Sequence, residues 1–255
     1  MKINTISCKN ISLSFDNKNI INDFNEVFEI NTLSAIKGLN GTGKSSLLKL
    51  ITGLNSNYSG NIFYDDKNIN QFSSREISNC VSYVGTRNHF TFPISVAELL
   101  NTGRYNYQNI FGKVSESDHQ NILTIVEEIG IMDLYTKNVQ NLSDGELQQV
   151  MIALALVRDT SFIILDEPTS FLDYKNREKI WNLLVALKNK GKGIIIASHD
   201  IFEIEKYAPN QAVSVGLLVV SVQSKHRNSL FRYRSETNVL IVPKLVSVPV
   251  SIVSN

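Results

Sequence analysis

The chain has 255 residues, which is enough for one large domain or two small ones around a sizeable buried core. Its formal net charge of +1 gives no reason to expect nucleic acid or an anionic membrane surface as a partner. Apolar runs stay shorter than about 18 residues, so no membrane-spanning helix is expected. Two cysteines, Cys8 and Cys80, in a chain without a signal-like leader predict a reducing, cytosolic setting.

Short β-rich runs alternate with amphipathic helices along the chain, which predicts a mostly parallel sheet covered on both faces. Residues 11–38 indicate several strands in succession. Apolar residues then take helical spacing within residues 38–54, and Gly53 is suited to end that helix. A strand with a turn is predicted at residues 61–69, and a strand that enters the core at residues 81–85.

The strand signal disappears between residues 90 and 157, and helical signals replace it. Residues 95–100, SVAELL, open with a capping box. Apolar side chains of the run 121–130 share one helical face: Ile122, Ile125, Val126 and Ile129. We therefore predict an inserted helical subdomain at about residues 88–157. Strands return at 161–168 and 193–199, on either side of a long helix at 175–191.

A phosphate-binding loop is predicted at residues 38–45, GLNGTGKS, which match G-x-x-x-x-G-K-[ST] between a strand and a helix. Its glycines let the backbone wrap around phosphates, Lys44 adds a charge against the β- and γ-phosphates, and Ser45 is suited to hold Mg²⁺. The alternative is a glycine-rich turn that only caps a helix. The candidate nucleotide-binding residues of this loop are Gly38, Leu39, Asn40, Gly41, Thr42, Gly43, Lys44, Ser45 and Ser46.

A second candidate element is FIILDEP, residues 162–168, an apolar strand that ends in two acids. Asp166 is predicted to order the Mg²⁺ shell, and Glu167 to orient a water molecule for in-line attack. The alternative is a helix N-terminus decorated with acids, which the helix dipole favours. The phosphate-binding loop upstream favours the metal and water interpretation.

A polar turn, NLSDGELQQVM at residues 141–151, comes directly before an apolar helix. Ser143 and Glu146 form a capping box, which explains both as parts of a well-made helix start. The capping box does not explain Gly145, because Gly in a first turn costs about 1 kcal/mol relative to Ala. This turn therefore calls for a second explanation.

Taken together, residues 3–208 resemble the ATP-binding subunit of ABC transporters. The resemblance implies an α/β fold of the P-loop NTPase type at residues 1–207, with a mostly parallel core sheet, an N-terminal antiparallel β part and the helical insertion. LSDGE resembles the signature motif of that family, in which a Ser and a Gly face the γ-phosphate of ATP held by a second subunit. Ser143 and Gly145 would then be half of an active site in a homodimer, with ATP and Mg²⁺ as cofactors.

Further residues match the family one by one. Phe15 stands where the family places an aromatic ring that stacks on adenine, although an ordinary core aromatic on an alternating strand is the alternative. His199 matches the histidine that contacts the γ-phosphate, and residues 170–173, SFLD, match the loop that crosses the dimer interface. The resemblance thus implies catalytic roles for Lys44, Glu167 and His199.

Two features depart from the family. Thr86 stands where the family usually has a Gln that reaches the metal and water, so the coupling to a permease is not defined by this residue. Residues 208–255 are rich in Val and Ser and carry five Lys or Arg against a single Glu. In this atypical tail, 215–222, 238–242 and 245–253 are predicted strands, and a shifted reading frame and a divergent β-rich appendage both remain open.

Four short motifs narrow the resemblance to one group of ATPases within the family. TGRYNY, GKVSESD, LSDGE and DEPTSFLD resemble the ATPases of bacterial importers for iron siderophores, haem and cobalamin. That implies a peripheral protein at the cytoplasmic face of the membrane, bound to permease subunits that a substrate-binding protein supplies, with no nucleic acid involved. The alternatives are a soluble ABC-type ATPase that acts on DNA or ribosomes, and a non-hydrolysing regulatory ATP binder.

Overall fold

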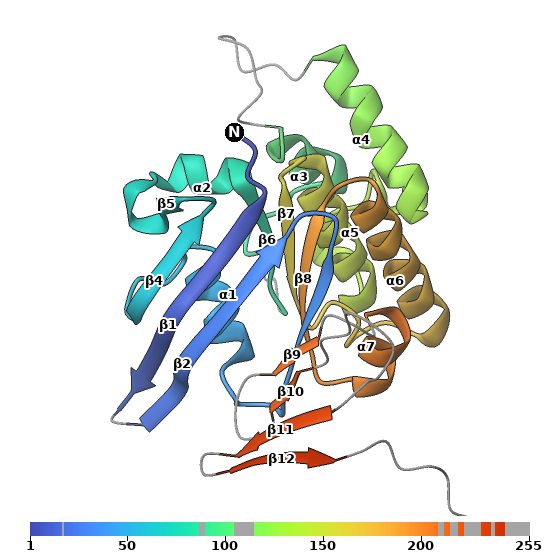
Figure 1. The fold of residues 1–255 in the computed structure, drawn as a ribbon. Coiled ribbons are helices and arrows are strands. Elements are labelled where there is room, and N and C mark those ends of the chain that lie inside the picture. Colours follow the sequence, from blue (N-terminus) through green and yellow to red (C-terminus); the bar gives the residue numbers. More distant parts are fainter. Residues whose placement is uncertain are drawn as a thin grey trace, which may run out of the picture.

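The computed structural model describes residues 1–16, 18–86, 90–104 and 115–208, and the backbone of four short strands within the tail. An antiparallel sheet and a parallel sheet lie on either side of α1, and a group of helices covers the far face of the parallel sheet (Figure 1). This arrangement confirms the predicted α/β class. The expected succession of strands before residue 38 is also confirmed.

The antiparallel sheet has the strand order β2-β1-β4-β5. Its strands are β1 (Thr5–Phe15), β2 (Lys18–Glu29), β4 (Ser59–Tyr64) and β5 (Lys67–Asn68). Apolar residues of β1 alternate toward the interior, and Ile6, Cys8, Ile11 and Leu13 are buried. Burial raises the pKa of the Cys8 thiol to about 12, so this cysteine is an inert part of the core.

The parallel sheet has the strand order β6-β7-β8-β3-β9, and all its pairs are parallel. Its strands are β3 (Leu33–Lys37), β6 (Val81–Val84), β7 (Phe162–Asp166), β8 (Gly193–Ser198) and β9 (Ala212–Ser214). Every residue of β3, β7 and β8 is buried, as expected for central strands covered on both faces. The carboxyl ends of these three strands therefore meet at one edge, where ligands of open α/β sheets bind.

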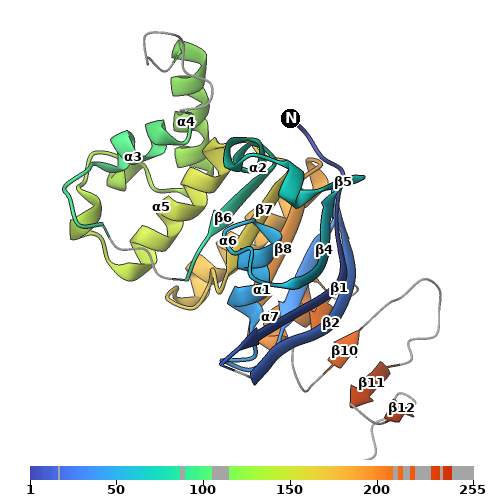
Figure 2. The same ribbon diagram turned by 90° about the vertical axis from the view of Figure 1, so that its left-hand side faces the viewer.

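Seven helices are assigned within the described residues. They are α1 (Lys44–Ile51), α2 (Ser74–Cys80), α3 (Val96–Thr102), α4 (Glu116–Ile129), α5 (Asp144–Val157), α6 (Tyr174–Asn189) and α7 (Ile201–Tyr207). Short 3₁₀ turns occur at Ile69–Gln71, Met132–Leu134 and Val139–Asn141. Figure 2 shows α3, α4 and α5 projecting beside the sheet, which confirms the helical insertion over its described part.

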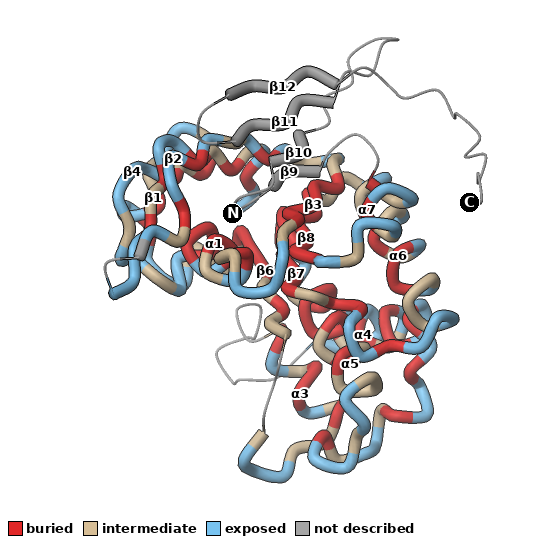
Figure 3. Tube along the Cα trace, turned by 90° about the horizontal axis from the view of Figure 1, so that it is seen from below, coloured by how far each residue is buried: buried red, intermediate tan, exposed pale blue. Residues whose placement is uncertain are grey.

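Two hydrophobic cores lie on the two faces of the parallel sheet. Ile163 and Leu165 of β7 face one core, which the helices α3 to α6 share. Phe162 and Ile164, one position away on the same strand, face the other core, which holds α1 and the antiparallel sheet. In Figure 3 the buried segments run through the middle of the molecule between these layers. The parallel sheet is therefore a rigid base for the loops at its edge.

Two regions were not fully predicted. The short helix α2 was not expected, although a capping box of Ser73 and Glu76 starts it. In the tail, β10 (Val219–Ser221), β11 (Phe231–Ser235) and β12 (Asn238–Val242) form an antiparallel sheet. Two of the predicted tail strands correspond to β10 and β12, and the third, at 245–253, lies outside the described residues.

In the parts of the chain that the structure describes, no helix is both long enough and apolar enough to cross a membrane.

Candidate functional site

The predicted phosphate-binding loop connects the carboxyl end of β3 to the start of α1. Thr42 closes the loop, because its N–H and its hydroxyl both donate to the Leu39 carbonyl, at 3.3 and 2.9 Å. Gly43 precedes α1 with φ 97°, and no side chain caps the helix there. The first N–H groups of α1 are therefore available to an anion, as the sequence pattern predicts.

Gly43 is required both by its backbone conformation and by its surroundings. A Cβ atom at this position would lie 2.5 Å from Ile20 Cγ2 of β2. At Gly41, where φ is 81°, the same atom would meet nothing within 4 Å. Substitutions at these two glycines therefore distinguish the cost of backbone strain from the cost of a steric collision.

We expect Gly43→Ala to lower the free energy of unfolding more than Gly41→Ala does. Both variants place Ala in a left-handed backbone conformation, which costs about 1–3 kcal/mol. Only Gly43→Ala also forces the Ile20 side chain to move. Urea titration of both variants and the wild type measures the difference. Equal losses of unfolding free energy in the two variants would show that Ile20 of β2 moves aside without a measurable cost.

Lys44 curls back over the loop toward the end of the neighbouring strand. Its Nζ donates to the carbonyls of Gly38 and Leu39, at 2.8 and 3.3 Å. It also lies 3.4 Å from Glu167 Oε1, and Lys44 is only 6% exposed. The only buried ammonium group on this loop is thus held over the loop and paired with a carboxylate.

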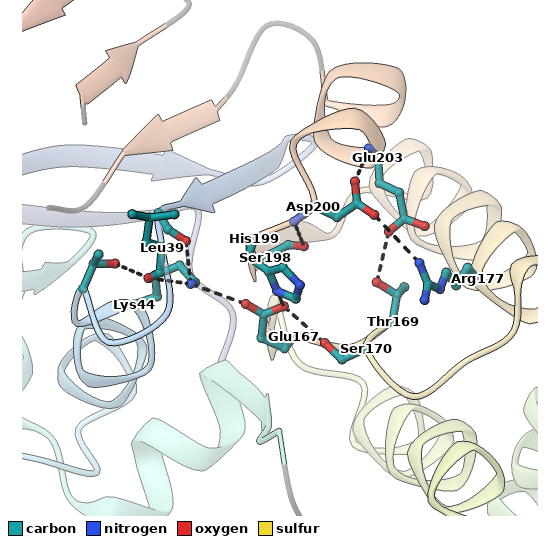
Figure 4. A network of polar contacts seen from close by, with 12 residues as sticks. Leu39, Lys44, Glu167, Thr169, Ser170, Arg177, Ser198, His199, Asp200 and Glu203 are labelled. Atoms are coloured by element: carbon teal, nitrogen blue, oxygen red, sulfur yellow. Dashed lines mark hydrogen bonds and ion pairs between the residues drawn. The ribbon is translucent and has the colours of Figure 1, made fainter. Parts of the chain in front are cut away.

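Glu167 connects the two other predicted catalytic residues. It follows β7 with φ 51°, a left-handed conformation that is unusual for a residue with a Cβ. Its N–H donates to the Ala197 carbonyl at 2.9 Å, which fixes the backbone to β8. Its Oε2 accepts from His199 Nδ1 at 2.7 Å and from the Ser170 hydroxyl at 3.2 Å. Figure 4 shows Lys44 at the start of α1, Glu167 after β7 and His199 after β8 converging on one point.

Asp166 has the properties of a metal ligand. It is 2% exposed, and its Oδ1 is buried without a hydrogen-bond partner among the described residues. A buried carboxylate oxygen without a donor is costly, and a cation removes that cost. Oxygen is also the ligand type that Mg²⁺ prefers. Asp166 therefore fits Mg²⁺, and the Ser45 hydroxyl, in the first turn of α1, is a second oxygen ligand of the type that Mg²⁺ takes.

Tyr83 was not predicted to belong to the site. Its hydroxyl lies 3.5 Å from Asp166 Oδ2, and burial together with the Asp166 charge raises the pKa of Tyr83. The phenol therefore stays protonated and faces the carboxylate as a donor. The sequence places Tyr83 on a predicted strand, but it does not give the order of the strands. The proximity of Tyr83 to Asp166 becomes visible only when β6 is known to lie beside β7.

The polar turn at residues 141–151 starts α5 as predicted. Ser143 is the residue before the helix, and its hydroxyl and N–H both donate to Glu146 Oε2 at 2.8 Å. These hydrogen bonds hold the pKa of Glu146 below its usual value. A Cβ on Gly145 would lie 3.1 Å from the Phe171 carbonyl, so Gly145 also allows the loop 170–173 to pack closely.

A cavity of about 460 Å³ opens beside this turn. Its walls come from α5, from the loop 170–173 and from the start of α6: Ser143, Asp144, Gly145, Glu146, Gln149, Phe171, Leu172, Asp173 and Asn176. All residues of the phosphate-binding loop are described, and none of them lines this cavity. The turn and the phosphate-binding loop are therefore separate surfaces within one chain.

The exposure of Phe15 excludes one of its two interpretations. Phe15 ends β1 and is 68% exposed, so the alternative of a core aromatic is wrong. Thr86 follows β6 and is partly buried. The structure brings together Lys44, Glu167 and His199, and it leaves Ser143 on another surface.

The sequence pattern of the ABC transporter family matches residues 21–170, which is more than half of the chain. The chain belongs to the ABC transporter family. Membership confirms the resemblance seen in the sequence.

Named relatives are ATP-binding subunits. The iron(3+)-hydroxamate import ATP-binding protein of Bacillus subtilis is 28% identical over 81% of this chain and 77% of its own length. The ferric enterobactin transport ATP-binding protein of Escherichia coli is 32% identical over 69% of this chain and 65% of its own length. Among solved structures, a metal-chelate type ABC transporter in an inward-facing conformation matches with a TM-score of 0.69. At 22% identity, over 91% of this chain and 83% of that one, this last likeness shows the fold.

Proposed function

We propose that this chain hydrolyses ATP with Mg²⁺ to power an ABC importer, as a homodimer bound to permease subunits at the cytoplasmic face of the membrane. The observation that carries the proposal is the contact of Glu167 with both Lys44 and His199 at the edge of the parallel sheet. These are a phosphate-binding cation, a carboxylate base and a histidine within one polar network. Family membership supports the nucleotide, and the named relatives support import over an action on DNA or ribosomes.

Each residue has a defined part in this reaction. Lys44 binds the β- and γ-phosphates, and the uncapped N–H groups of α1 bind the remaining phosphate oxygens. Asp166 and Ser45 would hold the Mg²⁺, which would neutralise charge on the phosphates. Glu167 orients the water and accepts its proton, and His199 holds the Glu167 carboxylate through the 2.7 Å hydrogen bond.

The proposed cargo is an iron siderophore or a related metal chelate. Support comes from the relatives, which include importers of iron(3+)-hydroxamate, petrobactin and ferric enterobactin. A manganese transport subunit of Halalkalibacterium halodurans is also 28% identical, so the chemistry shared by these names is a metal or its chelate. A substrate-binding protein that delivers the cargo belongs to the same proposal.

Co-purification with a candidate permease tests the proposed function. The complex in lipid should hydrolyse Mg²⁺-ATP faster when a loaded substrate-binding protein is added. Iron-siderophore, haem and manganese serve as parallel cargoes, with an apo substrate-binding protein as the control. An ATPase rate that no cargo changes, or failure to bind any permease, would contradict import.

The exposed ring of Phe15 is proposed to stack on adenine. We expect Phe15→Ala to weaken ATP binding by about 1–3 kcal/mol, the typical value for a base on an aromatic ring. Phe15→Tyr keeps the ring and should bind ATP almost as the wild type does. Isothermal titration measures both affinities, and Phe92→Ala, another exposed Phe at 59%, is the matched control. Unchanged affinity in folded Phe15→Ala would remove Phe15 from the adenine site.

A further inference from the structure

A second polar cluster lies beside the catalytic residues. Glu203 of α7 uses a single oxygen, Oε2, to accept from Thr169 Oγ1 at 3.1 Å and from Trp181 Nε1 at 2.8 Å. Thr169 and Trp181 are 4% and 0% exposed. A carboxylate that accepts two buried donors holds both in place more strongly than a neutral acceptor does. Figure 4 shows Thr169 and Glu203 to the right of the Glu167 and His199 pair.

The positions of these residues along the chain connect the cluster to Glu167 and His199. Thr169 follows Glu167 by two residues, and Glu203 follows His199 by four. The Glu167–His199 contact at 2.7 Å and the Thr169–Glu203 contact at 3.1 Å therefore tie the same two loops at two points. The two contacts and the two short chain segments form a closed ring.

The segment of the ring that runs from His199 to Glu203 is also attached to α6. Asp200 starts α7 and accepts from the Glu203 N–H at 3.2 Å. Asp200 also lies 3.8 Å from Arg177 of α6. Trp181 of α6 stacks on Tyr207 of α7, with ring centroids 5.1 Å apart and planes 3° apart. The short helix α7, and with it the loop that carries His199, is thereby fixed to α6.

We propose that Glu203 is a positioning residue that holds His199 against Glu167 and connects the phosphate site to α6 through Trp181. The catalytic part of this inference rests on the proposed ATPase function. A phosphate bound by Lys44 competes with Glu167 Oε1 for the ammonium group. Glu167 and Thr169 belong to one tight turn, in which the Ser170 N–H donates to the Glu167 carbonyl at 3.3 Å. A displacement of Glu167 therefore reaches Thr169, then Glu203, and then the Trp181 indole.

Trp181 makes the connection measurable, because it is the only tryptophan in the chain. We expect Mg²⁺-ATP to change the tryptophan fluorescence of the wild type, and Glu203→Ala to abolish that change. Glu203→Ala should also lower kcat by on the order of 100-fold, the typical cost of a small misplacement of a catalytic group, while KM for ATP stays the same. Glu203→Gln should restore most of both, because its carbonyl oxygen accepts the same two hydrogen bonds, although more weakly than the carboxylate does.

The controls separate positioning from general stability. Glu205→Ala removes an exposed carboxylate from the same helix and should leave kcat, KM and the fluorescence change as in the wild type. Thr169→Val removes one donor at constant shape, and it replaces Glu203→Ala in every measurement if that variant does not fold. The imidazole NMR resonances of His199 should shift in Glu203→Ala and Thr169→Val, but not in Glu205→Ala.

The outcomes distinguish this inference from the proposed function. Wild-type kcat, fluorescence response and His199 resonances in a folded Glu203→Ala variant would overturn the positioning role and leave the ATPase untouched. A wild type that does not hydrolyse ATP would overturn the proposed function. In that case the His199 resonances alone still decide whether Glu203 holds the histidine.

Discussion

Replacing Glu167 with Gln is expected to remove nearly all ATP turnover while ATP still binds. Gln has the same shape and keeps an oxygen for the bonds from His199 and Ser170, so the site stays assembled. It is too weak a base to accept the proton of the attacking water. A positioned base typically contributes a factor of about 10²–10⁴, so turnover should fall by that factor. Phosphate release and equilibrium nucleotide binding measure the two properties on the same preparation.

Lys44→Ala is the matched variant, because it changes the other end of the same ion pair. It removes the cation that addresses the phosphates, so we expect ATP binding itself to weaken. The two variants thus separate chemistry from binding. Equal turnover in the wild type and Glu167→Gln would exclude Glu167 as the base.

The motifs were predictable because each is local in the sequence. The loop at 38–46 owes its shape to glycines and to one lysine. The strand FIILD is recognisable from its continuous apolar run. Ser143 and Glu146 satisfy each other within a single helical turn. In each case the residues that decide the local structure lie within a few positions of one another.

Contacts between distant segments were not predictable in the same way. Lys44 meets Glu167 only because β3 and β7 flank β8 in one parallel sheet and end at the same edge. Tyr83 reaches Asp166 because β6 pairs with β7 in a register that no local pattern specifies. The Glu203 cluster likewise needs α6 and α7 to pack together. Strand order and helix packing, rather than residue type, decide all three contacts.

The unpredicted helix α2 and the excluded core interpretation of Phe15 have equally specific causes. Residues 74–80 lack an apolar period, and the capping box of Ser73 was the only sign of α2. Phe15 continues the alternation of β1 but lies at the last position of the strand, where the hydrophobic core has ended. A period of two cannot show where a sheet extends beyond its core.

ATP hydrolysis is expected to need two copies of this chain, because the phosphate-binding loop and the cavity beside Ser143 are separate surfaces of one copy. In the homodimer that we propose, Lys44 of one copy and Ser143 of the other contact the same γ-phosphate. A bacterial ABC transporter cassette solved as a dimer has the same fold, with a TM-score of 0.70 at 22% identity. Glu167→Gln should then trap the closed dimer, because the bridging ATP is not cleaved.

Light scattering with Mg²⁺-ATP tests the trapped dimer. Glu167→Gln should double in mass, and the double variant Glu167→Gln with Ser143→Arg should stay a monomer, because Arg places bulk at the interface. Asp133→Arg, an exposed position in the same helical subdomain, controls for the added charge and should leave the dimer intact. A dimer that persists with Ser143→Arg would place the interface elsewhere.

Mixing two inactive chains gives the sharper test of shared sites. Lys44→Ala and Ser143→Arg are each expected to be inactive alone, because every site in either homodimer carries one lesion. A mixed dimer has one site with both lesions and one site with neither. Some activity should therefore return on mixing, because each mixed dimer holds one intact site and carries the Ser143→Arg lesion at only one of its two sites. If each chain were self-sufficient, every site in the mixture would still carry one lesion, and no activity would return.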